Sequence, residues 1–501
     1  MVKNNFYITT PIYYVNDIPH IGHAYTNIVA DVIARFKKLD GFNVKFITGT
    51  DEHGQKVEKS AKKLNLEPQK FVDKIAQNFI NLSKDLNLIN NDFIRTTELR
   101  HKNFVSDIWK KLEDKKQIYL DKYAGWYSIR DEAYYADSEL IDGKAPTGAD
   151  VEWIEESSYF FKLSEWEDRL LEFYDKNPEF IKPIGRRNEV ISFVKSGLQD
   201  LSISRTAFKW GIKVPNNSDH VIYVWMDALF NYMSVLGNES SEFWPANLHI
   251  VGKDILRFHA VYWPAFLMAA DLAVPNQIFA HGWWTNEGQK ISKSVGNTID
   301  PYELINDYGL DYFRYYLIKE VTLGDDGNFL KTSFIERVNA ELVNKLGNLM
   351  HRTTNFIYKN CDKKIPAPSQ YTSEDKDILS KAYNTIEGLR KFIDQQMLRQ
   401  SLESIIELVS DANSYIDSEA PWRLKKTDVD RMNTVLYVLS EVIRVIGIVM
   451  QPFTPDSASK ILDYFNVNER DFSIIESSKI NHGMEIDEPS IIFNRIELNK
   501  A

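Results

Sequence analysis

The sequence predicts an α/β protein in which a parallel sheet covered by helices is interrupted by a β-containing insertion and followed by an all-helical bundle. Three observations lead to this prediction. Short apolar runs of strand type alternate with helical periodicity in residues 1–116 and 222–295. Residues 117–221 are instead aromatic, acidic and rich in turn residues. From about residue 335 onward, helical periodicity dominates.

The length and composition of the chain fit this division. It has 501 residues, enough for about three domains. A hydrophobic fraction of 44% is typical of a globular protein with a sizeable core. We expect six segments: the first half of the sheet domain at 1–116, the insertion at 117–221, the second half at 222–295, a connecting region at 296–340, the helical domain at 341–475 and a C-terminal segment at 476–501 that docks back.

The strands and helices of the sheet domain follow in order. We expect a strand at 6–10, a helix from about 24 to 38, and a strand "VKFITGTD" that ends at Asp51. Helical spacing then connects Phe71, Ile75, Phe79, Leu82 and Leu86. The second half contains the strand-type runs "HVIYVWMDAL", "LHIVGKD" and "QIFAHGWWTNEG", which end in polar or glycine residues. Such parallel sheets bind ligands beyond the carboxyl ends of their strands.

Helices account for the last third of the chain. Apolar residues recur as Ile386, Leu389 and Ile393, then as Leu398, Leu402, Ile405 and Val409, and again over 432–449. The most apolar stretch, 435–453, contains Glu441 and Arg444 and is closed by Pro452. It falls short of the ~20 uncharged residues that span a bilayer. We therefore predict a buried helix and no membrane association.

Cysteine content and charge limit the possible environments and partners. The single cysteine, Cys361, excludes an internal disulfide, and the first ten residues lack a secretory signal, so we expect a reducing cytoplasm. The net charge of −11 argues against nucleic acid only weakly, because phosphate contacts need no more than a local basic face. Residues 331–360 carry five Lys or Arg against two Glu, and 420–431 carry four against two acidic residues. On charge alone, an ordinary solvated helix face is the favoured interpretation of both segments.

The first motif that carries chemistry is His20, Gly22 and His23, in a turn between the first strand and the first helix. A helix N-terminus offers unpaired N–H groups and partial positive charge, and glycine permits close approach of the backbone. The two imidazoles could donate hydrogen bonds to phosphoryl oxygens. A capped turn that happens to contain histidine is the alternative.

The second motif is "KISKSVGN" at 290–297, where Lys290 and Lys293 flank Ser292. Lysine-rich loops are usually plain surface loops. Here, however, both motifs follow strands of one predicted sheet and flank its insertion. Ammonium groups in such a loop can stabilise the charge on departing pyrophosphate. Together the two motifs favour a nucleoside triphosphate site.

These motifs resemble the two signatures of class I aminoacyl-tRNA synthetases, His-Ile-Gly-His and Lys-Met-Ser-Lys-Ser, with Ile291 where methionine is usual. Within that class the chain resembles the methionyl-tRNA synthetase family over nearly its whole length. The similarity extends to "TTPIYYVNDIPHIGH", "TGTDEHGQK", "YVWMDALFNYM", "GKDILRFH", "HGWWTNEGQKISKS", "NKLGNLMHR", "SEAPWRLKK" and "PSIIFNRIEL". The resemblance implies a Rossmann-type catalytic domain, a connective insertion, a stem-contact region at 296–340 that continues the signature loop, and an anticodon-binding bundle.

The resemblance also implies roles for individual residues. The catalytic residues would be His20, His23, Lys290 and Lys293, and ATP binding would add Gly22, Asp254 and Ser292. Asp254 would reach the ribose, although a helix N-cap fits its position equally well. Asp51 would pair with the α-ammonium of methionine. The methionine pocket would consist of Ile12, Tyr14, Trp225, Ala228, Tyr232 and His281, with the Tyr232 hydroxyl and His281 near the sulfur.

Two further observations concern the residues of this pocket. Without the motif context, Trp225 and Tyr232 would be read as ordinary core residues of the sheet domain. Leu229 stands where some relatives have proline, which leaves the shape of the pocket open.

The implied RNA site lies in the helical domain. Asn348 and Arg352 are four residues apart and so lie on one helix face, and Trp422 stands among basic residues. Stacking on an aromatic ring together with hydrogen bonds from Asn and Arg is how proteins read single-stranded RNA loops. In the family, matching residues read the anticodon, so we expect methionine tRNA, both initiator and elongator, as the partner. We also expect Mg²⁺ with ATP and, since no domain follows residue 501, a monomer.

One departure from the family concerns zinc. Many relatives carry Cys-x-x-Cys zinc knuckles in the insertion, whereas this insertion has no cysteine and a single histidine, His220. We therefore expect no structural zinc. An aromatic cluster would replace its contribution to folding, consisting of Trp126, Tyr127, Tyr134, Tyr135, Trp153, Tyr159 and Phe160.

Competing functions share only parts of the pattern. The cysteine-specific class I enzyme relies on thiolate-bound zinc, and the leucine, isoleucine and valine enzymes carry editing insertions much longer than ~105 residues. A simple nucleotidyltransferase would have no use for the helical domain. A catalytically silent tRNA-binding paralogue would not need both intact signatures. We expect activation of L-methionine to methionyl-adenylate and its transfer to methionine tRNA, for initiation and elongation of translation.

Overall fold

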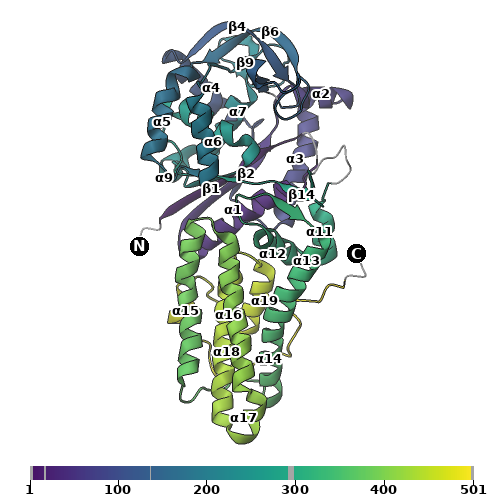
Figure 1. Cartoon of the computed structure of the whole chain (residues 1–501), viewed down its shortest axis with the longest axis vertical. Helices are drawn as coiled ribbons and strands as arrows, with labels where there is room; N and C mark the ends of the chain where they lie inside the picture. Colours follow the sequence, from purple (N-terminus) through teal and green to yellow (C-terminus); the bar gives the residue numbers. More distant parts are fainter. Residues whose placement is uncertain (1–3, 16–17, 132, 136, 291–297, 498–501) are drawn as a thin grey trace. The chain divides into compact units, whose positions relative to one another are not determined.

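The structure is a computed structural model that describes residues 4–15, 18–131, 133–135, 137–290 and 298–497 (Figure 1). The chain divides into two compact units. The sheet unit comprises Asn5–Ala30 and Val44–His281, and the helical unit comprises Met1–Asn4, Asp31–Asn43 and Gly282–Ala501. Helix α1 (Ile21–Leu39) contributes residues to both units. Each unit is described on its own.

A six-stranded sheet forms the centre of the sheet unit, in the order β3-β2-β1-β12-β13-β7. Its strands are β1 (Asn5–Tyr14), β2 (Asn43–Asp51), β3 (Asp92–Arg95), β7 (Ile181–Lys182), β12 (Leu248–Gly252) and β13 (Ile278–His281). The pairs β2–β3, β1–β12, β12–β13 and β13–β7 run parallel. From β1 the chain first builds the β2 side of the sheet and later the β12 side, so the strand order reverses at β1. The predicted fold class, an α/β protein with a parallel sheet, is confirmed.

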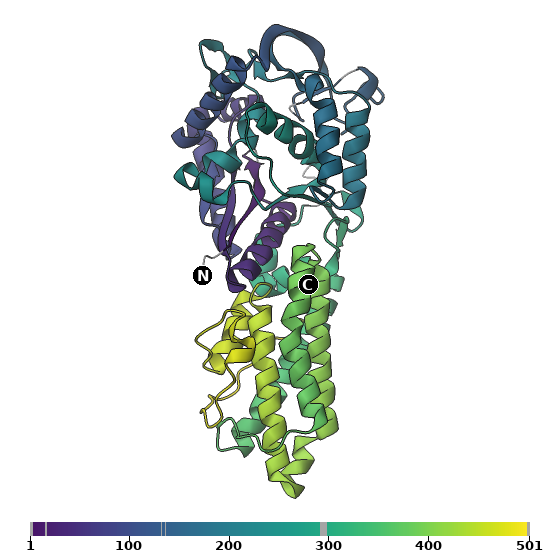
Figure 2. The same cartoon turned by 90° about the vertical axis from the view of Figure 1, so that its left-hand side faces the viewer.

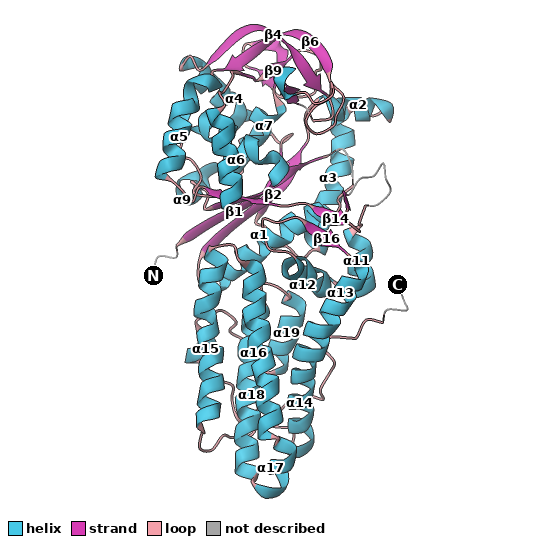
Figure 3. Ribbon diagram, in the orientation of Figure 1, coloured by secondary structure: helices cyan, strands magenta, loops and turns pink. Residues whose placement is uncertain are grey.

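Helices surround this sheet in the strand–helix alternation that the sequence predicts (Figure 3). They are α2 (Gln55–Lys63), α3 (Pro68–Asp85), α4 (Leu99–Asp114), α5 (Glu167–Lys176), α6 (Ile184–Lys195), α7 (Val224–Leu229), α8 (Asn231–Ser234), α9 (Ser240–Phe243) and α10 (Trp263–Ala269). Helix α3 buries Phe71, Phe79 and Leu82, as their spacing predicts. A π-helical turn at Phe258–Tyr262 leads into α10.

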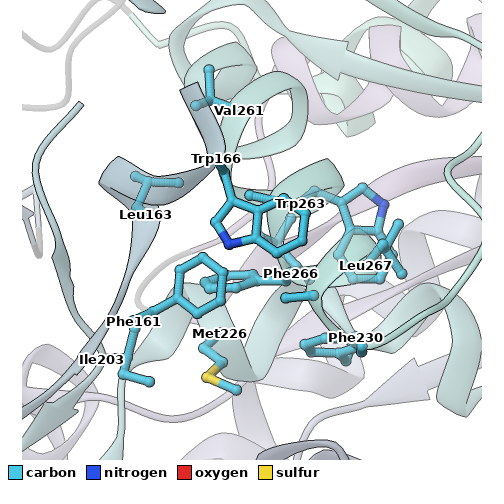
Figure 4. Packing of buried hydrophobic residues seen from close by; sticks show 14 of the residues in the cluster. Phe161, Leu163, Trp166, Ile203, Met226, Phe230, Val261, Trp263, Phe266 and Leu267 are labelled. Atoms are coloured by element: carbon cyan, nitrogen blue, oxygen red, sulfur yellow. The ribbon is translucent and has the colours of Figure 1, made fainter. Parts of the chain in front are cut away.

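The insertion is built on small antiparallel sheets. One contains β5 (Ala133–Tyr135), β4 (Ile118–Ser128), β6 (Glu152–Phe161) and β8 (Leu201–Ser202), and the other β10 (Lys213–Val214), β11 (Asn217–Ile222) and β9 (Ser204–Arg205). Part of the segment predicted as an insertion also joins the main sheet, because β7 is its edge strand. Phe161, Leu163 and Trp166 pack in one core cluster with Trp263 and Phe266 (Figure 4). The six predicted segment boundaries remain predictions.

The run "HVIYVWMDAL" is not a strand of the main sheet. Its first residues close β11, which pairs antiparallel with β9 and β10, and Val224–Leu229 form helix α7. The partners of β11 lie only a few residues earlier in the chain. Pairing with near neighbours through short connections closes smaller loops than another crossover would.

The helical unit contains a bundle whose long helices run alongside one another in both views (Figures 1 and 2). Its helices are α11 (Pro301–Tyr308), α12 (Leu310–Glu320), α13 (Lys331–Val338), a π-helical segment (Asn339–Gly347), α14 (Asn348–Asn360), α15 (Ser373–Asp394), α16 (Leu398–Glu419), α17 (Pro421–Thr427), α18 (Val429–Met450), α19 (Pro455–Tyr464) and α20 (Ile474–Ser477). The same unit contains a small sheet of β15 (Gln289–Lys290), β14 (Trp284–Asn286) and β16 (Gly327–Phe329), the last of which lies between α12 and α13 in the chain. The apolar residues predicted to recur in α15 and α16 are buried.

Helix α18 is long and apolar enough to cross a membrane by length and composition, but 94% of its most apolar window is buried inside the protein. Glu441 and Arg444 lie on this helix as a buried ion pair, with Arg444 Nη2 2.7 Å from Glu441 Oε1. Glu441 also accepts hydrogen bonds from the Tyr383 hydroxyl and the Ile480 N–H. The predicted buried helix is therefore confirmed.

The C-terminal segment contacts the bundle of the same unit. Tyr437 donates a hydrogen bond to the Ile480 carbonyl, and the Ile365 N–H donates to the Met484 carbonyl. Farther along, the Asn339 amide donates to the Ile496 carbonyl at 2.8 Å. The last two bonds tie the C-terminal segment to residues that precede it by more than a hundred positions.

Candidate active site

The histidine turn follows β1 at the point where the strand order of the sheet reverses. Helix α1 begins at Ile21, so Gly22 and His23 lie in its first turn and not in a loop ahead of it, as the sequence had suggested. The His20 N–H donates to His23 Nδ1 and the Gly22 N–H donates to His20 Nδ1, both at 3.1 Å. Since both Nδ1 atoms accept, each neutral ring carries its proton on Nε2. The turn thus presents two imidazole N–H groups at a helix N-terminus, an arrangement suited to an anion.

Gly22 is required by its contacts with His20. A β-carbon at position 22 would lie 2.9 Å from His20 Cε1 and 3.1 Å from Nδ1. Any side chain would therefore displace the His20 ring. The glycine permits the close approach between helix and imidazole that orients the ring.

The lysine motif lies mostly outside the described residues. Lys290 ends the short strand β15, which pairs antiparallel with β14. Ser292 and Lys293 belong to 291–297, which the structure does not describe. The roles predicted for these three residues stay predictions.

Asp51 and Asp254 lie at or just beyond the carboxyl ends of β2 and β12, the edge where parallel sheets bind ligands. Asp51 is the last residue of β2 and is 8% exposed. Its neighbour Glu52 is fully buried and accepts two hydrogen bonds from Arg95, at 2.6 and 2.9 Å. Asp254 stands in a 3-10 turn whose N-cap is Gly252, so Asp254 is not the cap residue that its position had allowed.

The residues predicted to form the methionine pocket are buried or partly buried, and several are aromatic. Trp225 stacks on Phe258 with ring centroids 3.8 Å apart, and Ala228 and Tyr232 are 4% and 1% exposed. Ile12 and Tyr14, near the end of β1, are partly buried. His281 ends β13 and is 5% exposed. All six residues belong to the sheet unit.

Tyr232 and His281, the two residues predicted to lie near the sulfur of methionine, both make hydrogen bonds within the protein. Tyr232 bonds to His259, and His281 bonds to Thr26. Burial lowers the pKa of His259 to about 4, so this ring is neutral at pH 7. Its Nδ1–H donates to the Ile255 carbonyl, and its Nε2 accepts from the Tyr232 hydroxyl at 2.7 Å. The Thr26 hydroxyl donates to the Gly22 carbonyl, which makes His281 Nε2 the donor in its 2.8 Å contact with Thr26. Neither His259 nor Thr26 was predicted as a site residue, although the motif "GKDILRFH" contains His259.

A second feature missed from the sequence is a buried carboxylate on α7. Asp227 accepts hydrogen bonds from His53 Nδ1 at 2.6 Å and from His101 Nε2 at 2.7 Å. Burial raises the pKa of Asp227, but the two histidines outweigh this effect and lower it to about 2. The motifs "TGTDEHGQK" and "YVWMDALFNYM" contain His53 and Asp227. Their pairing could not be read from the sequence, because 174 positions separate them.

The three predicted RNA-binding residues lie in the helical unit. Asn348 is the first residue of α14 and is exposed. Arg352, one turn later, lies 5.5 Å from the ring centroid of Trp422 on α17, and its guanidinium donates to Asp417 at 2.6 Å. Trp422 is 41% exposed. The fold thus brings together an arginine and a half-exposed tryptophan that are 70 positions apart in the sequence.

Among the described residues no group of three or more His, Cys, Asp or Glu could hold a metal ion. His220 is buried and bonded to Ser204. The aromatic residues of the insertion form separate contacts. Trp126 packs edge-on against Trp153, and Tyr159 packs edge-on against Trp109 and His220, whereas Phe160 stacks on Tyr119. Trp153 is 50% exposed, so it contributes little to a core. The absence of zinc remains a prediction.

A parallel sheet with a His-x-Gly-His turn at its switch point, followed by a helical unit that pairs arginine with an exposed tryptophan, has the architecture of class I aminoacyl-tRNA synthetases. The family "tRNA synthetases class I (M)" matches residues 6–151 and 139–354, and "Anticodon binding domain of methionyl tRNA ligase" matches residues 365–501.

Relatives extend this match to the whole chain. The methionine–tRNA ligase of Rickettsia conorii is 58% identical over 99% of this chain and 100% of its own length, and that of Rhizobium meliloti is 49% identical over 98% of each. The structure of Mycobacterium tuberculosis methionyl-tRNA synthetase in complex with methionyl-adenylate matches with a TM-score of 0.95 and 43% identity, over 98% of this chain and 100% of that one. The chain therefore belongs to the methionyl-tRNA synthetase family, the methionine–tRNA ligases.

Proposed function

We propose that this chain activates L-methionine with ATP, releasing pyrophosphate and forming methionyl-adenylate, and then transfers methionine to the 3′ end of its tRNA. The observation that carries the proposal is the geometry of the histidine turn. Backbone N–H groups occupy the Nδ1 atoms of His20 and His23, so each ring offers an Nε2–H donor at the N-terminus of α1. Such donors stabilise charge that develops on phosphoryl oxygens. The relative bound to methionyl-adenylate supports the same reaction.

The ATP site would combine this turn with the lysine loop. Gly22 lets the backbone approach the phosphates, while Lys290, Ser292 and Lys293 would neutralise the departing pyrophosphate. Asp254, exposed beyond the end of β12, would accept a hydrogen bond from the ribose. Mg²⁺ would enter with ATP and bridge its phosphates.

The methionine site would use opposite chemistry at its two ends. Asp51 would pair with the α-ammonium group and so position the carboxylate for attack on the α-phosphorus. Trp225, Ala228 and Tyr232 would enclose the side chain, with Ile12, Tyr14 and His281 completing the pocket. A polarizable thioether packs well against aromatic rings. Leu229, which is 1% exposed, belongs to a hydrophobic core cluster of the sheet unit.

The tRNA site would lie on α14 and α17. Trp422 offers a face on which an anticodon base can stack, and Arg352 and Asn348 offer donors to base edges. We infer that initiator and elongator methionine tRNAs both bind here. We further propose that the enzyme acts as a monomer in the cytoplasm, without structural zinc, and that its segments follow the six boundaries predicted from the sequence.

Amino-acid-dependent ATP–pyrophosphate exchange tests the proposed activity directly. With Mg-ATP and each of the twenty amino acids in turn, methionine should support the fastest exchange. Equal or faster exchange with leucine or cysteine would overturn the assignment. Exchange without tRNA charging would point instead to a nucleotidyltransferase.

A further inference from the structure

The buried carboxylate of Asp227 lies between two histidines from different parts of the sheet unit. His53 belongs to the turn after β2, and His101 belongs to α4. All three residues are at most 2% exposed. A buried carboxylate needs such donors, because an unpaired charge in the interior is costly. This requirement explains why the network exists but not why it occurs at this place.

The place is informative because the two sides of the His53–Asp227 bond carry different parts of the proposed methionine site. His53 follows Asp51, the proposed ammonium ligand, by two residues. Asp227 stands on α7 between Trp225 and Ala228, which are proposed to enclose the side chain. One hydrogen bond of 2.6 Å therefore joins the ammonium end of the site to the side-chain end.

Other bonds hold the turn on the β2 side. The Trp210 indole N–H donates to the Glu52 carbonyl at 2.6 Å, and the Gly54 N–H donates to the Trp210 carbonyl at 3.1 Å. The Glu52 N–H donates to the Thr96 hydroxyl oxygen. Helix α7, by contrast, has only six residues and no side-chain cap. If the His53–Asp227 bond were lost, α7 and its aromatic residue would shift more readily than the turn.

We propose that His53 and Asp227 are positioning residues that fix the distance between Asp51 and the pocket on α7, and thereby the length of amino-acid side chain that the enzyme accepts. This inference rests on the proposed function, because it assumes that Asp51 and Trp225 bind opposite ends of the substrate. Neither positioning residue needs to touch the substrate. Their effect is on geometry, so it appears as selectivity among side chains of different length.

His101 supplies a matched control. It donates to the other oxygen of the same carboxylate, but from α4, and its Nδ1 contacts the Ser234 hydroxyl on α8 at 2.8 Å. Within the described part of the chain, the His101 side chain makes no hydrogen bond to the turn that carries Asp51. Removing His101 should weaken the fold about as much as removing His53 does. The distance between Asp51 and α7 should not change, because the His53–Asp227 bond that fixes it remains.

The experiment measures kcat/KM for pyrophosphate exchange with methionine, with norvaline, whose side chain is shorter, and with ethionine, which is longer by one methylene. A methylene in a fitted pocket is worth about 10-fold to 200-fold in discrimination. His53→Ala should reduce the preference for methionine over ethionine by about 10-fold. His53→Asn, whose amide can place an N–H near the position of Nδ1, should restore it. His101→Ala should lower the melting temperature and keep the preference.

Several outcomes would contradict the proposal. If His53→Ala lowers exchange by the same factor for all three amino acids, the residue supports the fold without setting chain length. If His101→Ala changes the preference as much as His53→Ala does, the network acts as a general brace. Should His53→Ala not fold, the pair His53→Asn and His53→Gln decides, because Gln reaches the position of Nε2 and misses that of Nδ1; equal preferences in both would refute the inference.

The proposed function and this inference fail in different ways. If methionine does not support exchange in the native protein, the proposed function is wrong. If it does, and the variants keep the native preference, only the positioning role is wrong.

Discussion

Charged side chains are held differently in two regions of the molecule. In the candidate amino-acid site of the sheet unit the charge is buried, and on the candidate RNA face of the helical unit it is partly exposed. In the first, Asp227 is fully buried and bonded to two buried histidines. In the second, Arg352 retains 29% of its side-chain exposure and is held by one bond to Asp417, which is 61% exposed. Trp422 beside it is 41% exposed.

The difference follows from the size and hydration of the ligands. A free amino acid can be enclosed, so the polar groups around it must be satisfied by the protein itself. A base in an RNA loop is part of a large hydrated polymer, so its stacking partner has to remain accessible before binding. Buried networks therefore set geometry and are costly to break, whereas exposed residues supply affinity and are cheap to change.

The largest expected effect tests whether the free-energy cost of breaking an ion pair depends on its burial and not on the unit in which it lies. Glu441→Gln in α18 leaves the Arg444 guanidinium buried without its carboxylate partner. We expect the free energy of unfolding of the helical unit to fall by about 3–5 kcal/mol. Urea titration followed by circular dichroism measures it.

The control for this variant is an exposed pair in the same bundle. Lys381→Ala removes the contacts of Lys381 with Glu407 and Asp411, whose side chains are 68% and 39% exposed. It should cost at most about 1 kcal/mol. Similar losses in the two variants would contradict the rule that burial sets the cost.

The next effect concerns the chemistry of adenylation. Lys293→Ala should lower the adenylation rate by about 10² or more and leave methionine affinity nearly intact, because the ammonium acts on charge that develops in the transition state. Single-turnover formation of methionyl-adenylate measures the rate. Lys110→Ala, at an exposed position of α4, should change neither quantity. A change confined to the KM for methionine would mean that the loop is misassigned.

A smaller effect is expected at the RNA face. Trp422→Ala should lower tRNA aminoacylation by about 5-fold to 150-fold and spare pyrophosphate exchange, since a stacked base contributes ~1–3 kcal/mol. Trp422→Phe keeps an aromatic face and should recover part of the loss. If exchange falls in parallel with aminoacylation, Trp422 supports the fold of the unit, and the separation of the two regions is lost.

The last prediction is that removal of metal ions has no lasting effect on activity. Treatment with a strong chelator, followed by resupply of Mg²⁺, should leave exchange and aminoacylation unaltered, because the insertion lacks the four ligands of a tetrahedral zinc site. Metal analysis of the purified protein provides the direct measurement. One tightly held zinc per chain would show that carboxylates such as Asp131 act as ligands.

Local sequence determined much of this protein. The strand that ends at Asp51, the buried periodicity of α15 and α16, and the buried nature of α18 all follow from patterns within about twenty residues. The histidine turn was also recognisable, because its residues are contiguous. Only its exact boundary was misjudged: the helix begins at Ile21, as first turns often contain polar residues that periodicity does not reveal.

Tertiary structure alone decided which distant residues meet. The run "HVIYVWMDAL" splits into an antiparallel strand and helix α7 because β11 finds its partners nearby in the chain. Asp227 joins His53 across 174 positions, Tyr232 joins His259, and Arg352 meets Trp422. A local pattern records which face of an element is apolar, whereas a hydrogen bond between buried side chains depends on how the elements pack, and that information is distributed over the whole chain.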